Sequence, residues 1–125
     1  FSPADRYENI RRLAEVAKLM ADAGIIVIVA AITPYRQMRE NIRSLFAAGD
    51  YVEVYVHCSL STCQKRDVKG LYKKASQGLL TQMTGINDSY EEPLKPDIVV
   101  ETETSTTQSS VEKLLAWLQP LLALR

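Results

Sequence analysis

The run Ile25–Ile32, IIVIVAAI, is the feature of this sequence that most restricts the fold. It is continuously apolar, and most of its residues are β-branched. A strand that is apolar on both faces needs cover on both faces, as in the parallel sheets of α/β proteins. The run is also far too short to span a bilayer as a helix. We therefore predict a buried strand here, in a parallel sheet flanked by helices.

Helix signals stand on both sides of this run. Ser2 can cap a first helix, and Pro3 suits its first position. Apolar residues then recur at helical spacing as far as Gly24, which fits a C-terminal cap. After the run, Thr33 is placed to cap a second helix, with Pro34 as its first residue. The predicted strand therefore lies between two helices.

The rest of the chain alternates in the same way. We predict a second strand over Tyr51–Cys58, a short helix over Leu60–Arg66 and a third strand over Asp97–Thr102. Ser109 and Glu112 form a capping-box pattern before a closing helix, which Pro120 should kink or end. This alternation indicates an α/β fold with a parallel sheet, as a single domain over residues 1–125.

A long, mostly polar segment follows the short helix, over residues 67–96. Long connections of this kind are typically lids or binding loops. The basic stretch Lys65–Lys74 lies at its start, and Gly70 and Gly78 supply hinge points. Taken alone, such a basic stretch is more often solvated surface. Its place in a long loop favours a ligand role, so we predict a lid and binding-loop region over residues 65–96.

Ligands of open α/β sheets bind beyond the carboxyl ends of the strands. Three stretches should meet there: the turn at Thr33, the segment after the second strand, and the turn Thr102–Ser105. The helix start after Thr33, together with Arg36, could hold an anion. The plainer alternatives are that Thr33 is only a helix cap, and that a stripe of arginines is solvated surface pairing with Glu40. That stripe consists of Arg36, Arg39 and Arg43.

Composition argues against several functions. Lys and Arg number 15, as do Asp and Glu, so the formal net charge is +0 and gives no bulk attraction to nucleic acid or an acidic membrane. Cys58 and Cys63 fit neither a disulfide scaffold nor a zinc pattern, and His57 has no nucleophile partner in sequence. The five glycines do not form the GxxxxGK[ST] spacing of a phosphate-binding loop. We expect a cytoplasmic protein without a metal site of its own.

Four long stretches carry a resemblance to a known family. In chain order they are FSPADRYENIRRLAEVAKLMADAGIIVI, ITPYR, CQKRDVKGLYKKASQG and TGINDSYEEP. Together they resemble the adenylylsulfate kinase family. The resemblance implies a P-loop kinase fold and transfer of the ATP γ-phosphoryl group to the 3′-hydroxyl of adenosine 5′-phosphosulfate, in sulfate assimilation. It also implies Mg²⁺ with ATP and a homodimer. It leaves open fusion to, or association with, a sulfate adenylyltransferase.

The same resemblance implies residue roles. The sulfonucleotide would be bound by Phe1, Arg6, Asn9, Ile32, Thr33, Lys69 and Met83, with Phe1 stacked on its adenine. Thr33 stands where many relatives have a serine described as a phosphorylated intermediate, and Met83 stands where they have an aromatic residue. Arg66 would pack on the ATP adenine, and the chain would pass it again near Ser105. The lid over both nucleotides would comprise Lys69, Gly70, Leu71, Tyr72, Lys73 and Lys74.

The family's P-loop has no counterpart in this sequence. In the family it precedes the first of the four stretches, and the strand that enters it is central in the sheet. Its absence would leave a gap between unpaired strand edges. Because phosphoryl transfer depends on that loop, we expect a C-terminal part of a complete kinase, inactive alone. The alternative is a non-catalytic sulfonucleotide-binding or regulatory module. The first and third stretches disfavour a nucleotide kinase with another acceptor.

Overall fold

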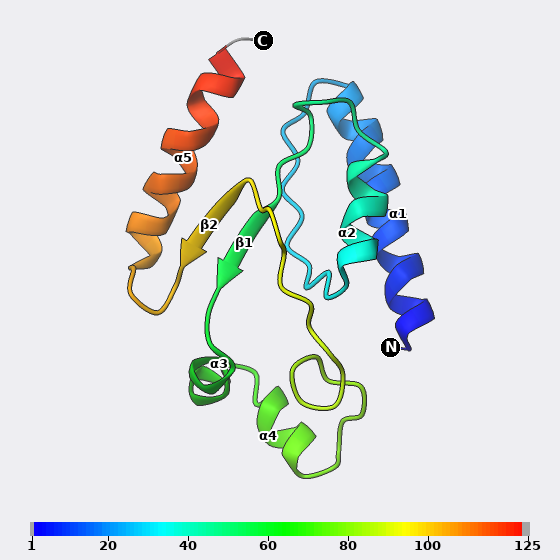
Figure 1. The fold of residues 1–125 in the computed structure, drawn as a ribbon, viewed down its shortest axis with the longest axis vertical. Coiled ribbons are helices and arrows are strands. Elements are labelled where there is room, and N and C mark those ends of the chain that lie inside the picture. Colours follow the sequence, from blue (N-terminus) through cyan, green and yellow to red (C-terminus); the bar gives the residue numbers. More distant parts are fainter. Residues whose placement is uncertain (1, 124–125) are drawn as a thin grey trace. The chain divides into compact units, whose positions relative to one another are not determined.

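The structure is a computed structural model, and it describes residues 2–123. Its elements, labelled in Figure 1, are α1 (Pro3–Asp22), α2 (Arg36–Arg43), β1 (Val54–His57), α3 (Leu60–Arg66), α4 (Leu71–Ser76), β2 (Ile98–Glu101) and α5 (Thr107–Ala123). They belong to two compact units. The first unit comprises Phe1–Tyr51 with Leu71–Pro93, and the second comprises Val52–Gly70 with Leu94–Arg125.

Helix α1 forms where the sequence predicts it. The Ser2 hydroxyl accepts the Asp5 backbone N–H at 3.1 Å, and the Asp5 carboxylate accepts the Ser2 N–H at 2.9 Å, which completes a capping box. At the other end, Gly24 has φ 86 and donates its N–H to the Ala21 carbonyl, while the next N–H bonds to the carbonyl of Met20. This pair of bonds is a Schellman motif, so Gly24 ends the helix as predicted.

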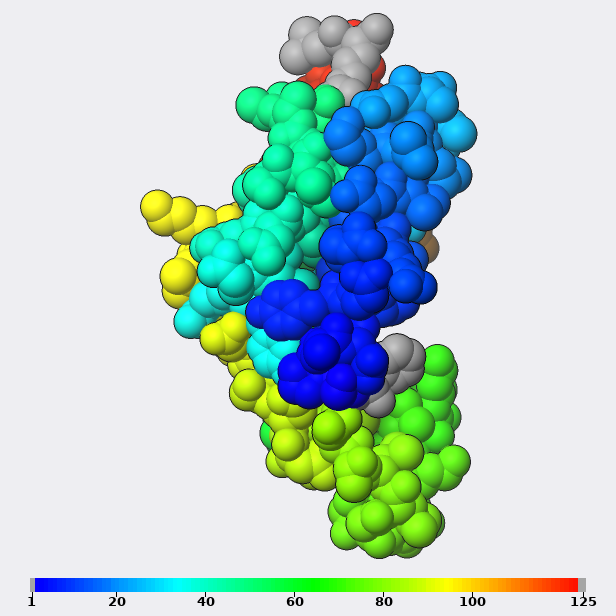
Figure 2. All heavy atoms as spheres, turned by 90° about the vertical axis from the view of Figure 1, so that its right-hand side faces the viewer, coloured from blue at the N-terminus to red at the C-terminus, as the bar shows by residue number. Residues whose placement is uncertain are grey.

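Helices α1 and α2 lie side by side in the first unit (Figures 1 and 2). Met38 of α2 is only 2% exposed, and α1 buries Ile10, Ala14 and Ala17. The spacing of these three residues places them on one face of α1. Because an isolated helix as short as the 8 residues of α2 is marginal in water, α2 depends on this packing for its stability.

The prediction of a strand over Ile25–Ile32 is wrong. This segment belongs to no helix or strand, and Ile26 and Ile28 are 65% and 89% exposed. A strand forms only where its backbone N–H and C=O groups pair with a neighbouring strand. Among its described residues the first unit contains helices but no strand that could pair with this segment.

Helix α2 begins later than predicted. Its first residue is Arg36 and its N-cap residue is Tyr35, whose side chain makes no capping hydrogen bond. The Oε1 atom of Glu91 instead accepts the Arg36 N–H at 2.8 Å. The prediction that Thr33 caps this helix and Pro34 is its first residue is therefore wrong. A carboxylate distant in sequence satisfies the free N–H group at this helix start.

Strands β1 and β2 of the second unit pair in parallel, in register from Val54–Ile98 to His57–Glu101. Ile98 and Val100 are buried, and α5 packs against β2 (Figure 1). The predicted α/β fold with a parallel sheet is confirmed. Both strands are shorter than predicted, because a strand extends only as far as its ladder of backbone hydrogen bonds.

The start and end of α5 differ from the prediction. The Ser109 N–H donates to the Thr106 hydroxyl at 3.1 Å, so Thr106 caps the helix and Ser109 lies in its first turn. The predicted capping box at Ser109 is therefore wrong, and Thr106, which also suits a cap, takes that position. Pro120 lies inside α5, which continues to Ala123, so the expected end at Pro120 does not occur.

The long polar segment contains a helix that the sequence analysis did not predict. Helix α4 lies between Gly70, with φ 66, and Gly78, with φ 73. Glycine adopts such backbone angles without a steric penalty. The N–H of Gly78 bonds to the Ala75 carbonyl at 3.1 Å and closes the helix. The preceding helix, α3, has the bounds that the sequence predicted.

Candidate functional site

The turn at Thr33 has an unusual backbone. Thr33 has φ 42, in the left-handed region that a β-branched residue seldom occupies. Its carbonyl accepts a hydrogen bond from Arg39 Nη1 at 2.6 Å. The next carbonyl, of Pro34, accepts the Glu91 N–H at 2.8 Å. Two contacts from outside the turn therefore hold this candidate site residue in place.

The sequence suggested that Arg39 belongs to a solvated stripe of arginines, but the structure buries it. The residue is 6% exposed, and its guanidinium donates to the carbonyls of Thr33 and Glu91. Arg36 also has specific partners, since its Nε donates to the Glu92 carbonyl at 2.8 Å. The Arg43 guanidinium lies 4.8 Å from the centre of the Tyr51 ring. The solvated stripe is therefore wrong for Arg39, which is buried, whereas Arg36 and Arg43 are exposed as expected.

Arg6, near the start of α1, reaches the loop that contains Met83. Its Nη1 donates to the Thr84 hydroxyl at 2.9 Å, its Nη2 donates to the Gln82 carbonyl, and its Nε lies 3.6 Å from Asp88 Oδ2. The Arg6 and Asp88 side chains are each 16% exposed, and Arg6 Nε is buried without a hydrogen-bond partner. Two residues predicted to bind one ligand, Arg6 and Met83, thus belong to one structural cluster.

Asp88 also binds Tyr35, which lies in the turn before α2. The Tyr35 hydroxyl is 2.9 Å from both carboxylate oxygens, and the ring of Tyr7 stacks on Tyr35 with centroids 5.6 Å apart. The hydrogen bond to Asp88 raises the pKa of Tyr35 above its ordinary value of 10.0, with further contributions from burial and from the Asp88 charge. The phenol therefore remains a donor at neutral pH and helps to fix Asp88 beside Arg6.

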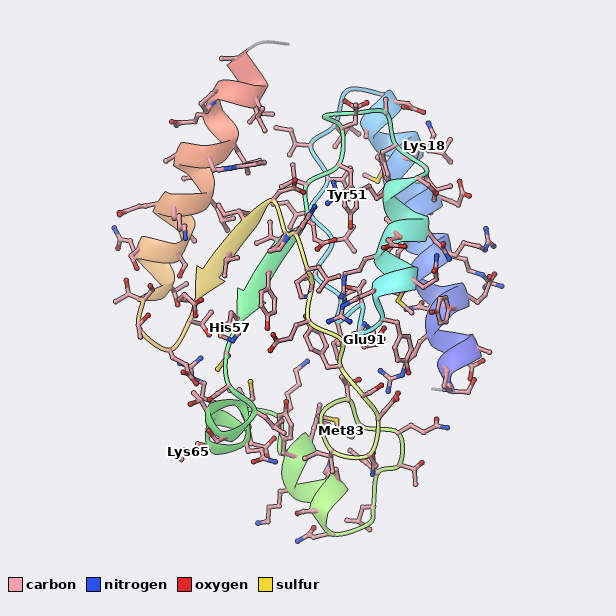
Figure 3. The ribbon with its side chains drawn as sticks, viewed as in Figure 1. Lys18, Tyr51, His57, Lys65, Met83 and Glu91 are labelled. Carbon is pink, nitrogen blue, oxygen red and sulfur yellow. The ribbon has the colours of Figure 1, made fainter. Side chains whose placement is uncertain are left out.

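The sequence analysis missed most of these supporting residues. Tyr35 lies in the motif ITPYR, and Asp88 and Glu91 lie in TGINDSYEEP. Both motifs carry the resemblance to the family, but the sequence alone predicts no role for these side chains. Contacts between residues more than fifty positions apart carry no signal in a single sequence. Glu91, labelled in Figure 3, lies near the start of α2, where its carboxylate accepts the Arg36 N–H.

Other residues predicted for the sulfonucleotide lie at the surface. Asn9 is exposed on α1, and Ile32 is 58% exposed in the unpaired segment. Phe1 lies outside the described residues. The structure therefore brings Arg6 and Met83 into one cluster and places Thr33 within the contacts of Arg39 and Glu91. It gives Asn9 and Ile32 no comparable arrangement, and their roles stay predictions.

The predicted lid contains parts of both units. Arg66 ends α3, and Lys69 and Gly70 follow it in the second unit. The rest of the lid lies in α4 of the first unit: Leu71, Tyr72, Lys73 and Lys74. Lys69, Lys73 and Lys74 are exposed. Closure of this region over two nucleotides stays a prediction.

Arg66 and the turn near Ser105 come together in the second unit. Arg66 Nη2 donates to the Thr102 carbonyl at 2.9 Å, and Nη1 lies 3.3 Å from the Thr102 hydroxyl. Thr102 directly follows β2, whereas Arg66 ends the helix that follows β1. The carboxyl ends of parallel strands lie at one edge of a sheet, so this proximity follows from the topology. Ser105 is exposed three residues further on.

A second polar cluster lies at the same edge. The Glu103 carboxylate accepts the Ser59 backbone N–H at 3.0 Å and the Ser59 hydroxyl. Hydrogen bonds from Ser59 and Thr62 lower the pKa of Glu103 from 4.5 to about 2. His57, which ends β1, pairs with Glu101 of β2 at 2.7 Å (Figure 3). Both carboxylates thus connect the two strand ends, which is a structural role.

We expect Glu103→Gln to flatten the acid dependence of stability. Because the pKa of Glu103 is depressed in the folded chain, its contribution is fully present above pH 4.5 and is lost as the pH falls towards 2. Urea unfolding at several pH values should show the variant less stable at pH 6, with the difference vanishing in acid. The exposed Glu92, changed to Gln, serves as the control. If the stability of the unchanged chain and that of Glu103→Gln varied with pH in the same way, the depressed pKa of Glu103 would not be the cause of the acid dependence.

Within residues 2–123, no group of three or more His, Cys, Asp or Glu side chains is placed to hold a metal ion. None of the helices in the same range has the length and apolar character needed to cross a membrane. The site is therefore described by its arginines, hydroxyls and carboxylates.

Residues 1–101 match the family model described as adenylylsulphate kinase. The chain is 54% identical over 95% of its length to the adenylyl-sulfate kinase of Geotalea daltonii, and 49% identical over 94% to the probable adenylyl-sulfate kinase of Halalkalibacterium halodurans. These alignments cover 59% and 58% of the two relatives. The chain thus spans about three fifths of the length of these curated relatives.

A solved structure gives the same result. The chain is similar to the APS kinase of Mycobacterium tuberculosis, solved in complex with AMPPNP and APS, with a TM-score of 0.86 and 38% sequence identity. The match covers 95% of this chain and 69% of that one. The fold of helices around a small parallel sheet is thus shared over nearly the whole chain.

Proposed function

This chain belongs to the adenylylsulphate kinase family, and on that premise we propose that it acts in the transfer of the γ-phosphoryl group of ATP to the 3′-hydroxyl of adenosine 5′-phosphosulfate. The observation that carries the proposal is the match to an APS kinase structure that contains both AMPPNP and APS. In the reaction the 3′-oxygen forms a bond to the γ-phosphorus, the bond to the β,γ-bridging oxygen breaks, and ADP and a proton are released.

The first unit supplies the sulfonucleotide side of this proposal. Arg6 offers a guanidinium for the phosphosulfate group, and Asn9 offers an amide for the ribose. The hydroxyl of Thr33 and the side chain of Ile32 line the same site, and Phe1 and Met83 pack on the adenine. Arg6 supports this assignment because it is partly buried within the Met83 loop, where a charge acts more strongly than in water.

The second unit supplies the ATP side. Arg66 and the turn near Ser105 approach the ATP adenine, and their proximity at the strand ends supports this assignment. Lys69 is proposed to contact the sulfonucleotide, and the lid that contains Lys69 and the lysines of α4 brings positive charge to the phosphates on closure. Such charge stabilises the transferring phosphoryl group.

Mg²⁺ is the expected cofactor and enters with ATP, whose phosphate oxygens are its preferred ligands. The described residues offer no cluster of carboxylates that would hold it independently. No step of the proposal therefore depends on a metal ligand of this chain. A homodimer and a cytoplasmic location complete the proposal, which leaves open fusion to, or association with, a sulfate adenylyltransferase.

A second candidate is a module that binds the sulfonucleotide without catalysis. The observation that favours it is the absence of GxxxxGK[ST] spacing from the 125 residues. Under this alternative the Arg6 cluster binds adenosine 5′-phosphosulfate and the ATP side is not used. The two candidates differ in whether ATP binds.

Calorimetry and a coupled ADP-release assay separate the candidates. We expect saturable binding of adenosine 5′-phosphosulfate and of ATP to the 125-residue chain, and no ADP release above blank with both ligands and Mg²⁺. Binding of the sulfonucleotide alone would favour the non-catalytic module. Turnover would establish the kinase and contradict the expected inactivity of this chain. Binding of neither ligand would contradict both candidates.

A further inference from the structure

The backbone at Thr33 requires an explanation that its own sequence does not give. A threonine with φ 42 is rare, because its branched Cβ crowds the backbone in the left-handed region. Residues in such conformations persist only where surrounding contacts fix them, and they are frequent at functional sites. The contacts around Thr33 therefore indicate what fixes this turn.

Arg39 provides the strongest of these contacts. Its guanidinium donates to the Thr33 carbonyl at 2.6 Å and, at the same time, to the carbonyl of Glu91. A planar guanidinium with several donors can bind two carbonyls in this way, whereas a lysine ammonium acts as a point charge. With 6% of its surface exposed, Arg39 has little water to replace these partners.

Glu91 completes a closed set of bonds around the turn. Its N–H donates to the Pro34 carbonyl at 2.8 Å, and its carboxylate accepts the N–H of Arg36, the first residue of α2. Arg39 therefore joins the Thr33 turn to a segment more than fifty residues away. Loss of the guanidinium would leave two carbonyls without their donor and would free the Thr33 backbone.

We propose that Arg39 is a positioning residue that holds Thr33 in its left-handed conformation and so sets the direction of the Thr33 hydroxyl in the sulfonucleotide site. The importance of that hydroxyl rests on the proposed function. The conformational part of the proposal rests on the geometry alone. Arg39 itself does not touch the ligand.

The test compares Arg39→Met with Arg39→Lys and with the control Arg12→Met. Arg12 is a suitable control because its side chain is 73% exposed and bonds to Glu8 on its own helix. NMR couplings and carbon chemical shifts report the φ angle of Thr33 without any ligand. We expect Thr33 to move to negative φ in Arg39→Met and to keep positive φ in the control.

Ligand affinity gives a second readout. Loss of hydrogen bonds from a charged donor should weaken the binding of adenosine 5′-phosphosulfate about tenfold or more in Arg39→Met. Binding of ATP should change by less than about twofold, as for a surface substitution. Arg39→Lys should give an intermediate affinity. A residue that only stabilised the fold would affect both ligands together.

A double-mutant cycle with Thr33→Gly covers the case in which Arg39→Met folds poorly. Glycine adopts positive φ freely, so the loss of melting temperature caused by Arg39→Met should be smaller in the Thr33→Gly background. Additive losses, or positive φ at Thr33 in Arg39→Met, would overturn the proposal. If the unchanged chain binds no adenosine 5′-phosphosulfate, the proposed function fails, while φ and the cycle still decide the role of Arg39.

Discussion

Replacement of Arg6 by methionine is expected to weaken the binding of adenosine 5′-phosphosulfate roughly thirtyfold, since a hydrogen bond to a charged group contributes about 2 kcal/mol. Arg6 is the one residue of the predicted sulfonucleotide site, within residues 2–123, whose charged side chain joins α1 to the Met83 loop. Methionine fills a similar volume but offers no donor to the phosphosulfate. Calorimetry with the sulfonucleotide alone measures the effect.

Controls for this prediction separate charge from folding. Arg12→Met removes an arginine from an exposed position of the same helix and should leave the affinity unchanged. Arg6→Lys keeps the charge but lacks the planar guanidinium, so its affinity for the sulfonucleotide should lie between those of Arg6→Met and Arg12→Met. Circular dichroism checks that each variant is folded, because Arg6→Met leaves Asp88 without its cationic neighbour. Equal affinities for Arg6→Met and the unchanged chain would exclude Arg6 from the site.

The second large effect concerns stability. Met38→Ala is expected to lower the free energy of unfolding by about 2–5 kcal/mol, the range for removal of a large buried side chain. Met38 is 2% exposed on α2, and α2 packs against α1. The loss combines the transfer of buried apolar atoms with the cavity that remains. Urea denaturation followed by circular dichroism measures it.

Leu19→Ala provides the matched control for Met38→Ala. Leu19 lies on α1 but is 71% exposed, so its truncation should change the free energy of unfolding by no more than about 0.5 kcal/mol. Similar losses for the two variants would show that the contact between α1 and α2 does not stabilise the first unit.

Local signals in the sequence were sufficient to predict the bounds of some elements. The capping box at Ser2 and the Schellman motif at Gly24 depend on neighbouring residues, and α1 begins and ends as they predict. The parallel sheet was also predicted, because alternation of strands and helices leaves few topologies. The proximity of Arg66 and the turn after β2 follows from that topology.

The remaining differences have a common physical cause. The strand predicted over Ile25–Ile32 needs a partner, and strand formation depends on the partner as much as on apolar composition. The start of α2 is decided by Glu91, and the burial of Arg39 is decided by the same distant segment. A single sequence records neither pairing. Its helical spacing therefore placed Arg39 with Arg36 and Arg43 as surface residues.

The exposed segment over Ile25–Ile32 has a consequence for handling the protein. It combines β-branched residues, no charge and no proline, which is the composition of segments that stack into intermolecular β-structure. Ile26 and Ile28 are open to solvent and the backbone there is unpaired, so a second chain can supply the missing hydrogen bonds. Self-association of the chain should therefore rise with its concentration. Low ionic strength should reduce this association only weakly, because the segment carries no charge that would repel a second copy.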